Sequence, residues 1–113
     1  MINACVIGLS TIGLLHCRNL IKIKKTQLTY VFDYNSKLRI KISKKFKCKT
    51  SNNFENILKD KSIKLFIIAS PTNTHEHYVR KLISHNKMIY CEKPILMNLN
   101  KLKPLVEKLN LKE

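Results

Sequence analysis

The segment GLSTIG, at residues 8–13, has the residue types of a turn that binds a nucleotide pyrophosphate. In the pattern G-x-G-x-x-G, Gly8 permits the tight turn and Gly13 lets the next helix pack closely on the strand, so that helix N–H groups face the phosphates. Ser10 stands where the pattern has its second glycine. Its Cβ crowds the closest backbone approach to a phosphate, whereas its hydroxyl can cap the helix or donate a hydrogen bond. Two glycines occur at many strand–turn–helix junctions, so this segment alone is weak evidence.

Asp33 ends the apolar run YVFD, twenty residues after Gly13. The nucleotide pattern expects a carboxylate at about this distance, where it accepts hydrogen bonds from the adenosine ribose. The alternative is a polar residue that caps a strand or the next helix. In the ribose-binding role, a 2′-phosphate about 4 Å from the carboxylate costs roughly 4 kcal/mol at an effective dielectric constant near 20, on the order of a thousandfold in affinity. We therefore expect NAD rather than NADP, in agreement with Tyr34 and Asn35, which follow without an arginine.

A proline turn follows the third apolar run, KLFIIAS. Pro71 turns the chain, and Thr72 or Asn73 can cap the helix that comes next. His75 lies in the expected first turn of that helix, where by position alone it is an ordinary polar residue.

The run IYC stops at a charge pair, Glu92 and Lys93, followed by Pro94. Because proline fixes its own φ and restricts the residue before it, Lys93 is held in place at the end of the strand. A lysine in that position can hydrogen-bond a ribose or substrate hydroxyl and stabilise negative charge that develops on a substrate oxygen during hydride transfer.

These residues need a scaffold that brings strand ends together. Four apolar runs, at residues 3–9, 28–32, 64–70 and 87–91, predict strands, with a minor strand near residues 46–50, and amphipathic segments separate them. The alternation predicts an α/β fold with a doubly wound, parallel, Rossmann-type sheet, whose ligands collect beyond the carboxyl ends of the strands. The expected apolar stripes of the helices are Ile12, Leu15, Leu20 and Ile23; Leu38, Ile42 and Phe46; Phe54, Ile57 and Leu58; Tyr78, Val79, Leu82 and Ile83; and Leu99, Leu102, Val106 and Leu109.

The net charge of the chain is +15, from 22 basic and 7 acidic residues. Only Arg18, Arg39 and Arg80 are arginines, although arginine fits phosphate better than lysine does. We interpret the lysine excess as a composition bias of the whole chain and expect no nucleic-acid partner. The densest basic run, at residues 37–49, has apolar residues at four-residue spacing and is interpreted as a solvated helix face. The alternative, a basic nucleic-acid-binding protein, requires an affinity that falls steeply with salt.

The four cysteines, at positions 5, 17, 48 and 91, show neither a C-x-x-C motif nor paired histidine spacing. This pattern favours a reduced, cytoplasmic setting, and we expect no metal site. The start MINACVIGLSTIGLL lacks the basic residues that precede the apolar core of a signal peptide, and no apolar run is long enough to cross a membrane. We therefore expect no membrane partner.

With these strand ends in order, the sequence resembles the glucose-fructose oxidoreductase/inositol dehydrogenase/rhizopine catabolism (Gfo/Idh/MocA) family across residues 1–113. The segments IIASPTNTH and YCEKPILMNL are similar to the two most recognisable segments of that family. The segment STIGLLHCRNL resembles the G-R-I-G-x-x-H-x-x-N segment of its inositol 2-dehydrogenase members. Ile12, Gly13, His16 and Asn19 match that segment, while Ser10 and Thr11 depart from it.

The resemblance implies an NAD-dependent oxidoreductase that moves a hydride from a ring hydroxyl carbon of a polyol or sugar to NAD. It implies that Lys93 is the catalytic-site lysine and that the Lys93–Pro94 peptide is a candidate for the cis form. The implied cofactor contacts are Gly8, Ser10, Thr11, Ile12, Asp33, Ser70, Pro71, Thr72, His75, Glu92 and Lys93.

In that family a histidine that takes the hydroxyl proton belongs to a second α/β domain, which also forms the oligomer. Compared with the members of that family, residues 1–113 are expected to correspond to the N-terminal NAD(P)-binding Rossmann-like domain, truncated before its last strand and without the substrate domain. We therefore expect a domain that is inactive alone and needs a missing C-terminal half, or a homo-oligomer. The alternative is a non-catalytic Rossmann-like nucleotide-binding or interaction module.

Overall fold

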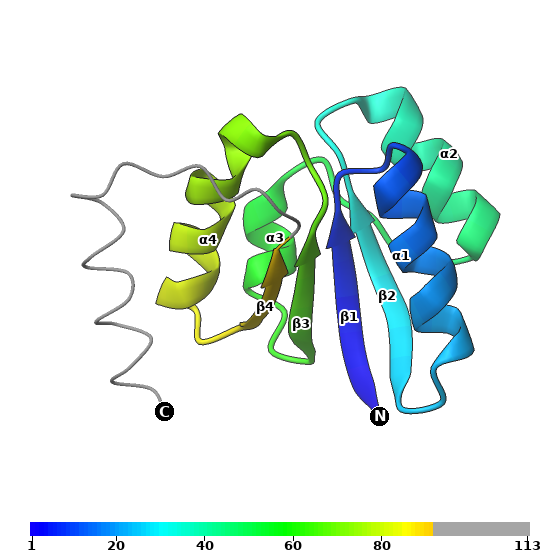
Figure 1. Cartoon of the computed structure of the whole chain (residues 1–113), viewed down its shortest axis with the longest axis horizontal. Coiled ribbons are helices and arrows are strands. Elements are labelled where there is room, and N and C mark those ends of the chain that lie inside the picture. Colours follow the sequence, from blue (N-terminus) through cyan, green and yellow to red (C-terminus); the bar gives the residue numbers. More distant parts are fainter. Residues whose placement is uncertain (92–113) are drawn as a thin grey trace.

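The computed structural model describes residues 1–91, in which strands and helices alternate (Figure 1). The fifth amphipathic segment expected from the sequence, at residues 99–109, lies outside the described residues. The elements are β1 (Ile2–Ile7), α1 (Thr11–Lys22), β2 (Thr26–Phe32), α2 (Ser36–Phe46), α3 (Phe54–Leu58), β3 (Ile63–Ile68), the 3₁₀ turn η1 (Thr72–Thr74), α4 (His75–Ser84) and β4 (Met88–Cys91).

The four strands form one parallel sheet in the order β2-β1-β3-β4, so the predicted α/β Rossmann-type fold is confirmed. The chain moves outward from β1 in one direction to β2 and in the other to β3 and β4. The strand order therefore reverses at β1, and this is where ligands collect in sheets of this kind. The minor strand expected near residues 46–50 is reduced to a single parallel bridge between Tyr30 and Lys49.

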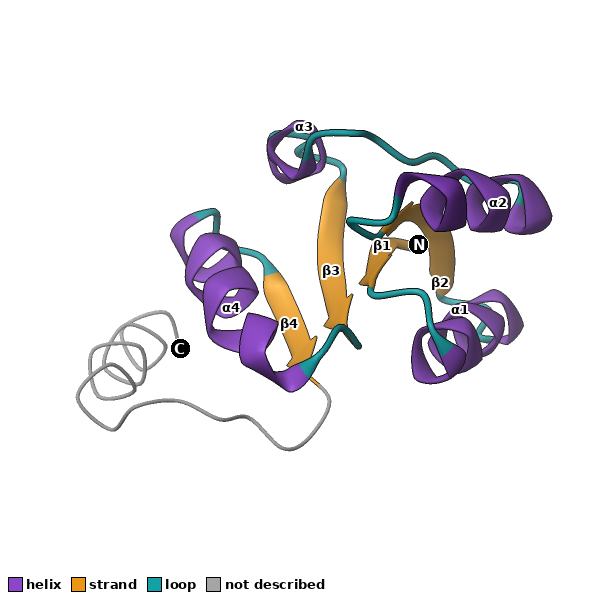
Figure 2. Cartoon of the chain, turned by 90° about the horizontal axis from the view of Figure 1, so that it is seen from above, coloured by secondary structure: helices purple, strands orange, loops and turns teal. Residues whose placement is uncertain are grey.

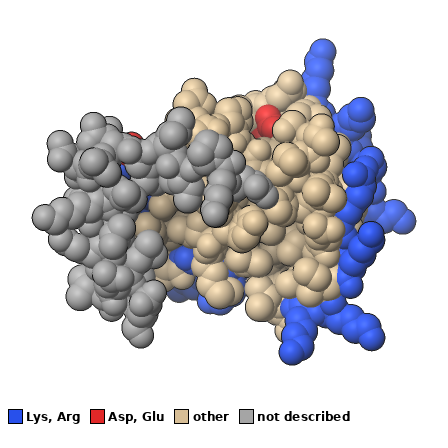
Figure 3. All heavy atoms as spheres, viewed as in Figure 1, with Lys and Arg blue, Asp and Glu red and all other residues tan. Residues whose placement is uncertain are grey.

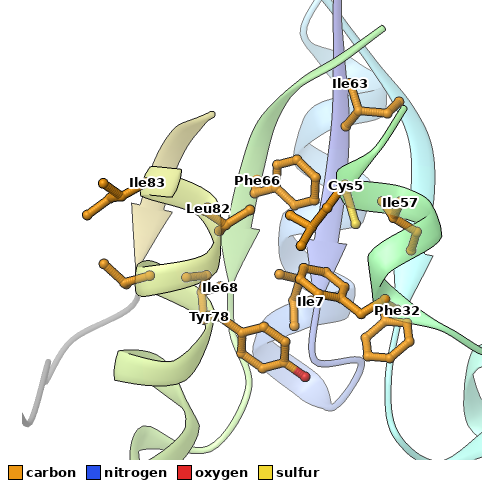
Figure 4. Close-up of a cluster of buried hydrophobic side chains, with 13 residues drawn as sticks. Cys5, Ile7, Phe32, Ile57, Ile63, Phe66, Ile68, Tyr78, Leu82 and Ile83 are labelled. Carbon is orange, nitrogen blue, oxygen red and sulfur yellow. The ribbon is translucent and has the colours of Figure 1, made fainter. Parts of the chain in front are cut away.

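Helices cover both faces of the sheet, as Figure 2 shows from above. The strands β1, β2 and β3 alternate their side chains between two apolar clusters, because successive residues of a strand point to opposite faces. In β4, Ile89 and Cys91 pack on one cluster, while Met88 and Tyr90 are exposed. One cluster lies under α3 and α4 (Figure 4) and the other under α1 and α2. The largest buried side chains of the first are Tyr78, Phe66, Ile7 and Ile57, and those of the second include Leu9 and Val6.

The apolar stripe predicted for α1 is wrong at three of its four positions. Ile12, Leu15 and Ile23 are about half exposed, and only Leu20 is buried. The buried residues of α1 are Gly13, Cys17 and Leu20, at i, i+4 and i+7. The small side chains at the first two positions let α1 lie close against the sheet, and this closeness turns the larger apolar residues outward.

Helix α2 covers residues 37–46 of the basic run and exposes Lys37, Lys41, Lys44 and Lys45 to solvent. The prediction of a solvent-exposed helix face is confirmed for this part of the run. In Figure 3 the Lys and Arg side chains gather along the edge of the molecule where α2 lies, and most of the face in view is uncharged. No helix among residues 1–91 has the length and apolarity to cross a membrane.

An ion pair between Glu55 and Lys81 joins α3 to α4 above the same face of the sheet. The hydrogen bond from Lys81 lowers the pKa of Glu55 below its ordinary value of 4.5. A carboxylate with a lowered folded-state pKa stabilises the fold fully above its unfolded-state pKa and loses that contribution as the pH falls through the folded-state value. We expect Glu55→Gln to make the fall in unfolding free energy below pH 4.5 shallower, measured by urea titration at several acidic pH values.

Asp60 is a second source of acid sensitivity, because hydrogen bonds from Ser62 lower the pKa of its carboxyl group. It contributes to the fall in unfolding free energy that remains in Glu55→Gln. Asp60→Asn should therefore flatten the residual slope. Identical acid profiles for Glu55→Gln and the native chain would contradict the assignment of the slope to this ion pair.

Candidate functional site

The turn between β1 and α1 requires glycine at its first position. Gly8 has φ +90°, a conformation that side chains rarely adopt, and its N–H donates to the carbonyl of Phe32 at 2.8 Å. A Cβ on Gly8 would lie 2.4 Å from the backbone nitrogen of Ser70. The turn after β1 and the turn after β3 are therefore in direct backbone contact, and Gly8 is the residue that permits it.

Gly13 fills the role that the nucleotide-binding pattern gives to its last glycine. A Cβ at this position would lie 1.7 Å from the carbonyl oxygen of Gly8, an overlap that no rotamer can relieve. The first turn of α1 therefore closes tightly over the end of β1. The predicted structural reasons for both glycines are confirmed.

Ser10 precedes α1 at the N-cap position, and its carbonyl accepts a hydrogen bond from Leu14 N–H at 2.9 Å. Its side chain makes no capping hydrogen bond, so the expectation that the hydroxyl caps the helix is wrong. Ser10, Thr11 and Ile12 are all exposed at the start of the helix. The hydroxyl of Ser10 is consequently placed toward solvent beside the first N–H groups of α1.

This placement predicts an unusual result for an N-cap serine. Ser10→Ala is expected to change the unfolding free energy by less than about 0.5 kcal/mol, whereas loss of a capping side chain typically costs about 1 kcal/mol. Asn35→Ala is the matched control, because the Asn35 side chain does cap α2, accepting from Leu38 N–H at 3.1 Å. Urea unfolding of the two variants measures the difference. Equal losses would mean that Ser10 caps α1 after all.

Asp33 lies directly after β2 and points back toward the first turn. One carboxylate oxygen accepts the N–H of Leu9 at 3.0 Å, and the other accepts the N–H of Asn35 at 2.9 Å. These two bonds fix the carboxylate at the carboxyl edge of the sheet. Each carboxylate oxygen has a second lone pair, so Asp33 keeps the capacity to accept hydrogen bonds from a ligand. The helix cap that was the alternative role for Asp33 belongs to Asn35.

The turn after β3 is held by a short chain of hydroxyl groups. Because a carbonyl can only accept, Thr74 donates its hydroxyl proton to the carbonyl of Pro71 at 2.6 Å, and Ser70 in turn donates to the oxygen of Thr74 at 2.6 Å. Thr72 lies in the 3₁₀ turn η1, and the N-cap of α4 is Thr74. The expectation that Thr72 or Asn73 caps the helix is therefore wrong by one or two residues.

His75 is buried, with an exposed fraction of 2%. Its Nε2 lies 2.7 Å from the carbonyl of Ser70, and since a carbonyl is only an acceptor, Nε2 carries the proton. In the neutral ring Nδ1 is then an acceptor, and within residues 1–91 it finds no hydrogen-bond partner. His75 thus supports the turn after β3 and is more than the ordinary polar residue that its position alone suggested.

Two neighbouring cavities open at this edge and share the turn of Ser70 and Pro71. The first, of about 190 Å³, also holds Gly8 and Asp33. The second, of about 330 Å³, also holds Ser10, Ile12, Ala69, Thr72 and His75. The structure thus brings together the predicted residues of three strand ends, except that Thr11 lines neither cavity. Glu92, Lys93 and the Lys93–Pro94 peptide lie outside the described residues.

The first cavity has walls that sequence reasoning missed. Tyr78, Thr74 and Ile7 line it, together with Tyr34. Tyr78 had been assigned to a helix core stripe, and it is indeed buried, but burial and a hydrogen bond with Tyr34 raise the pKa of its hydroxyl at the cavity. A signal was available, because a buried tyrosine needs a partner for its hydroxyl, and Tyr34 at the end of the sheet provides one.

The site offers no metal chemistry from the described side chains, since no three His, Cys, Asp or Glu residues among positions 1–91 gather closely enough to hold an ion. Burial raises the pKa of the Cys17 and Cys48 thiols to about 12 and about 11, which favours the protonated form over the reactive thiolate at neutral pH. What the site offers is a cradle of backbone around two glycines and a fixed carboxylate at its rim. These features fit a dinucleotide, with phosphates at the first turn of α1 and a ribose at Asp33.

Comparison with known proteins gives relatives for nearly the whole chain. A family model described as "Oxidoreductase family, NAD-binding Rossmann fold" (GFO_IDH_MocA) matches residues 2–113. Myo-inositol 2-dehydrogenase of Thermotoga maritima is 30% identical over 103 residues, 90% of this chain and 31% of that protein. The NAD(+)-dependent scyllo-inositol 2-dehydrogenase of Bacillus subtilis is 28% identical over 109 residues, 95% of this chain and 32% of that protein.

Among solved structures, GenD2 from gentamicin A biosynthesis, in complex with NAD, superposes with a TM-score of 0.91. It is 19% identical, and the match covers 98% of this chain and 32% of that one. At this identity the likeness shows the fold. The chain spans about a third of the length of the curated relatives that it matches.

Proposed function

Because this chain belongs to the Gfo/Idh/MocA oxidoreductase family, with an NAD-binding Rossmann fold, we propose that it is the NAD-binding part of a dehydrogenase of the inositol 2-dehydrogenase type. The observation that carries the proposal is the meeting of Gly8, Asp33 and Pro71 around one cavity at the point where the strand order reverses. The identities of about 30% to two inositol dehydrogenases support the substrate class, a polyol or sugar with a ring hydroxyl.

The described residues have separate tasks in this proposal. The N–H groups at the first turn of α1, beside Ser10, Thr11 and Ile12, hold the pyrophosphate, and the hydroxyl of Ser10 donates to it. Asp33 accepts hydrogen bonds from the adenosine ribose, while Tyr34 and Tyr78 enclose the adenosine. The turn of Ser70, Pro71 and Thr72 forms the wall on the side of β3, and His75 keeps that turn in place through the carbonyl of Ser70.

When bound, NAD would supply the acceptor for the hydride that leaves the carbon bearing the substrate hydroxyl. Glu92 and Lys93 are proposed to lie at the nicotinamide end, where Lys93 hydrogen-bonds the substrate oxygen and stabilises the charge that grows on it. The hydroxyl proton leaves to a base that we place in a second domain. We accordingly propose that residues 1–113 alone bind NAD and do not turn over substrate.

Calorimetric titration of the purified chain tests the proposal, since the absence of tryptophan makes fluorescence quenching a poor probe. We expect NAD to bind in the millimolar range or tighter, and AMP to bind with a large part of that affinity because the described cavities accept the adenosine half. Because the proposed site itself holds a pyrophosphate, inorganic sulfate is the control for unspecific attraction to a chain of charge +15. Heat from sulfate equal to that from NAD would refute the site.

A second measurement addresses the reaction. Incubation of the chain with NAD and myo-inositol is expected to give no NADH absorbance. Turnover by the chain alone would contradict the proposed need for a second domain while leaving the cofactor site intact.

A further inference from the structure

A groove of about 340 Å³ lies between α1 and the outer half of the sheet. Leu65 and Ile67 line it from β3, Leu20 and Ile23 line it from α1 and its C-cap, and Tyr90 lines it from β4. None of its residues belongs to the two cavities at the carboxyl edge, so the proposed nucleotide site leaves this groove without a role.

The flank of α1 that borders the groove is largely apolar at both ends. His16 and Asn19 line the groove, and helical spacing puts Ile12 and Ile23 on the same stripe as these two residues. Ile12 and Ile23 are both about half exposed. Two of the residues that were predicted for the core thus lie beside the groove instead.

The other border is β4, whose side chains alternate between the two faces of the sheet. Ile89 and Cys91 pack on the cluster under α3 and α4, so Met88 and Tyr90 point to the face of the groove. Met88 and Tyr90 are also about half exposed. The rings of Tyr90 and His16 meet edge to face with centroids 5.5 Å apart, which links β4 to α1 across the groove.

The fold leaves this side of the outer strands open. Helix α1 packs mainly on β1 and β2, and α2 packs on β2, so within residues 1–91 no helix lies over the groove side of β3 and β4 (Figure 2). The connection from β3 to β4 runs through α4 on the opposite face, and a right-handed crossover to any further strand beyond β4 would use that opposite face again. An apolar face that the fold leaves open marks a contact with another polypeptide.

The groove also lacks charge, in a chain whose net charge is +15. No Lys, Arg, Asp or Glu of the described residues lines it. Figure 3 shows this side of the molecule, where the Lys and Arg side chains gather along the edge at α2 and most of the face is uncharged. Lysines spread by composition bias alone would reach exposed positions on every face. Depletion of charge together with an aromatic residue and a methionine, here Tyr90 and Met88, is typical of the core of a protein interface.

From these observations we propose that the groove is the contact surface between two copies of this chain. An acidic partner would be attracted to the lysines of α2 and would gain nothing from an uncharged groove. A second copy brings the same uncharged, apolar face, so the two surfaces match in a two-fold arrangement. The lysine edge of each copy then stays at the periphery, and Tyr90 and Ile23 of each copy pack against the groove of the other. The inference does not depend on the proposed function.

Sedimentation velocity of the purified full chain, from low micromolar to millimolar concentration, measures the association. We expect the average mass to rise from that of a monomer toward that of a dimer. Added salt is expected to leave the association intact or to strengthen it, because the contact contains no ion pairs and salt screens the repulsion between two positively charged copies.

Ile23→Glu tests the location of the contact, because it places a carboxylate in the groove. Ile21→Glu is the matched control, since Ile21 is 55% exposed, Ile23 is 50% exposed, and the two side chains lie on different flanks of α1. Both substitutions change the net charge equally, so general repulsion between copies changes equally as well. We expect Ile23→Glu to weaken the dimer by about tenfold or more, the loss typical of a central interface residue, and Ile21→Glu to leave it unchanged.

Tyr90→Glu is expected to act as Ile23→Glu does, and it keeps the test decisive if one of the two variants fails to fold. Urea midpoints establish which variants are folded. A native chain that remains a monomer at millimolar concentration overturns the inference and assigns the groove to a different polypeptide. Association that is insensitive to Ile23→Glu and Tyr90→Glu, or that Ile21→Glu weakens to the same extent, overturns it as well.

Discussion

Asp33→Ala is expected to abolish the calorimetric signal of NAD binding to this chain. The carboxylate stands at the rim of the cavity shared by Gly8 and Pro71, held there by the N–H groups of Leu9 and Asn35. Hydrogen bonds to a charged group contribute about 1.5–3 kcal/mol each, and a loss of this size lowers affinity by roughly ten- to a hundredfold. Starting from millimolar binding, the variant falls below detection.

The control for Asp33→Ala must remove a negative charge from another carboxylate that also accepts a backbone hydrogen bond. Asp60 provides it, because its carboxylate also accepts a backbone N–H, that of Ser62 at 3.0 Å, and it lies before the amino end of β3, away from the cavities. Asp60→Ala should leave NAD binding unchanged. An affinity for NAD that is the same in Asp33→Ala, Asp60→Ala and the native chain would count against the ribose-binding role of Asp33.

Gly13→Ala is expected to destabilise the fold by about 3 kcal/mol or more, the range of severe overpacking. The sign of this change in unfolding free energy is informative, because replacing glycine by alanine inside a helix ordinarily stabilises it by roughly 1 kcal/mol. Here the added Cβ meets the carbonyl oxygen of Gly8 at 1.7 Å, and backbone must move to accept it. Urea unfolding measures the free energy, and a loss of NAD binding is expected to accompany it, since the displaced backbone belongs to the proposed phosphate-binding turn.

Asn19→Ala on the same helix controls for helix propensity alone. Asn19 is exposed, and the substitution is expected to leave the unfolding free energy within about 0.5 kcal/mol of the native value, as surface changes usually do. A Gly13→Ala variant as stable as Asn19→Ala would show that α1 does not close tightly over the end of β1.

Most of the sheet could be predicted because its strands are short continuous apolar runs. The run at residues 64–70 became β3 with a shift of one or two residues at its ends, and the run at residues 87–91 became β4. The strands β1 and β2 begin one and two residues before the apolar runs that predicted them. Exposed polar residues such as Gln27 join a strand through backbone pairing, and the type of their side chain does not predict this.

The predicted buried face of α1 is wrong because residue hydrophobicity does not determine the orientation of this helix. The close contact of Gly13 with the end of β1 determines it. Once Gly13 must face the strand, helical spacing places Cys17 and Leu20 on the same face. Ile12 and Leu15 then point away, whatever their hydrophobicity. The signal was present in the nucleotide-binding pattern, which fixes the orientation of the helix before any count of apolar residues.

The site could be predicted where a strand end coincided with a change of residue type, as at Asp33 and Pro71. It could not be predicted where a residue enters from the side of a helix. Tyr78 reaches the cavity from α4 and Arg39 reaches the loop from α2, and both positions depend on how the helices pack. The missing cap of Ser10 and the hydrogen bonds of Thr74 likewise depend on hydroxyl directions that residue spacing does not encode.

The chain contains only two glycines among 113 residues, and their positions identify the tightest backbone packing in the described fold. Its two glycines stand at the junction of β1 and α1, Gly8 in the turn and Gly13 in the first turn of the helix. Left-handed backbone elsewhere in residues 1–91 is borne by Lys47 and Asn86, at φ 53° and 59°, where a side chain has room to project. Within residues 1–91 the strain of left-handed backbone, about 1–2 kcal/mol for a residue with a Cβ, is thus tolerated at two exposed positions, whereas at the β1–α1 junction an added Cβ would overlap backbone atoms at both glycines.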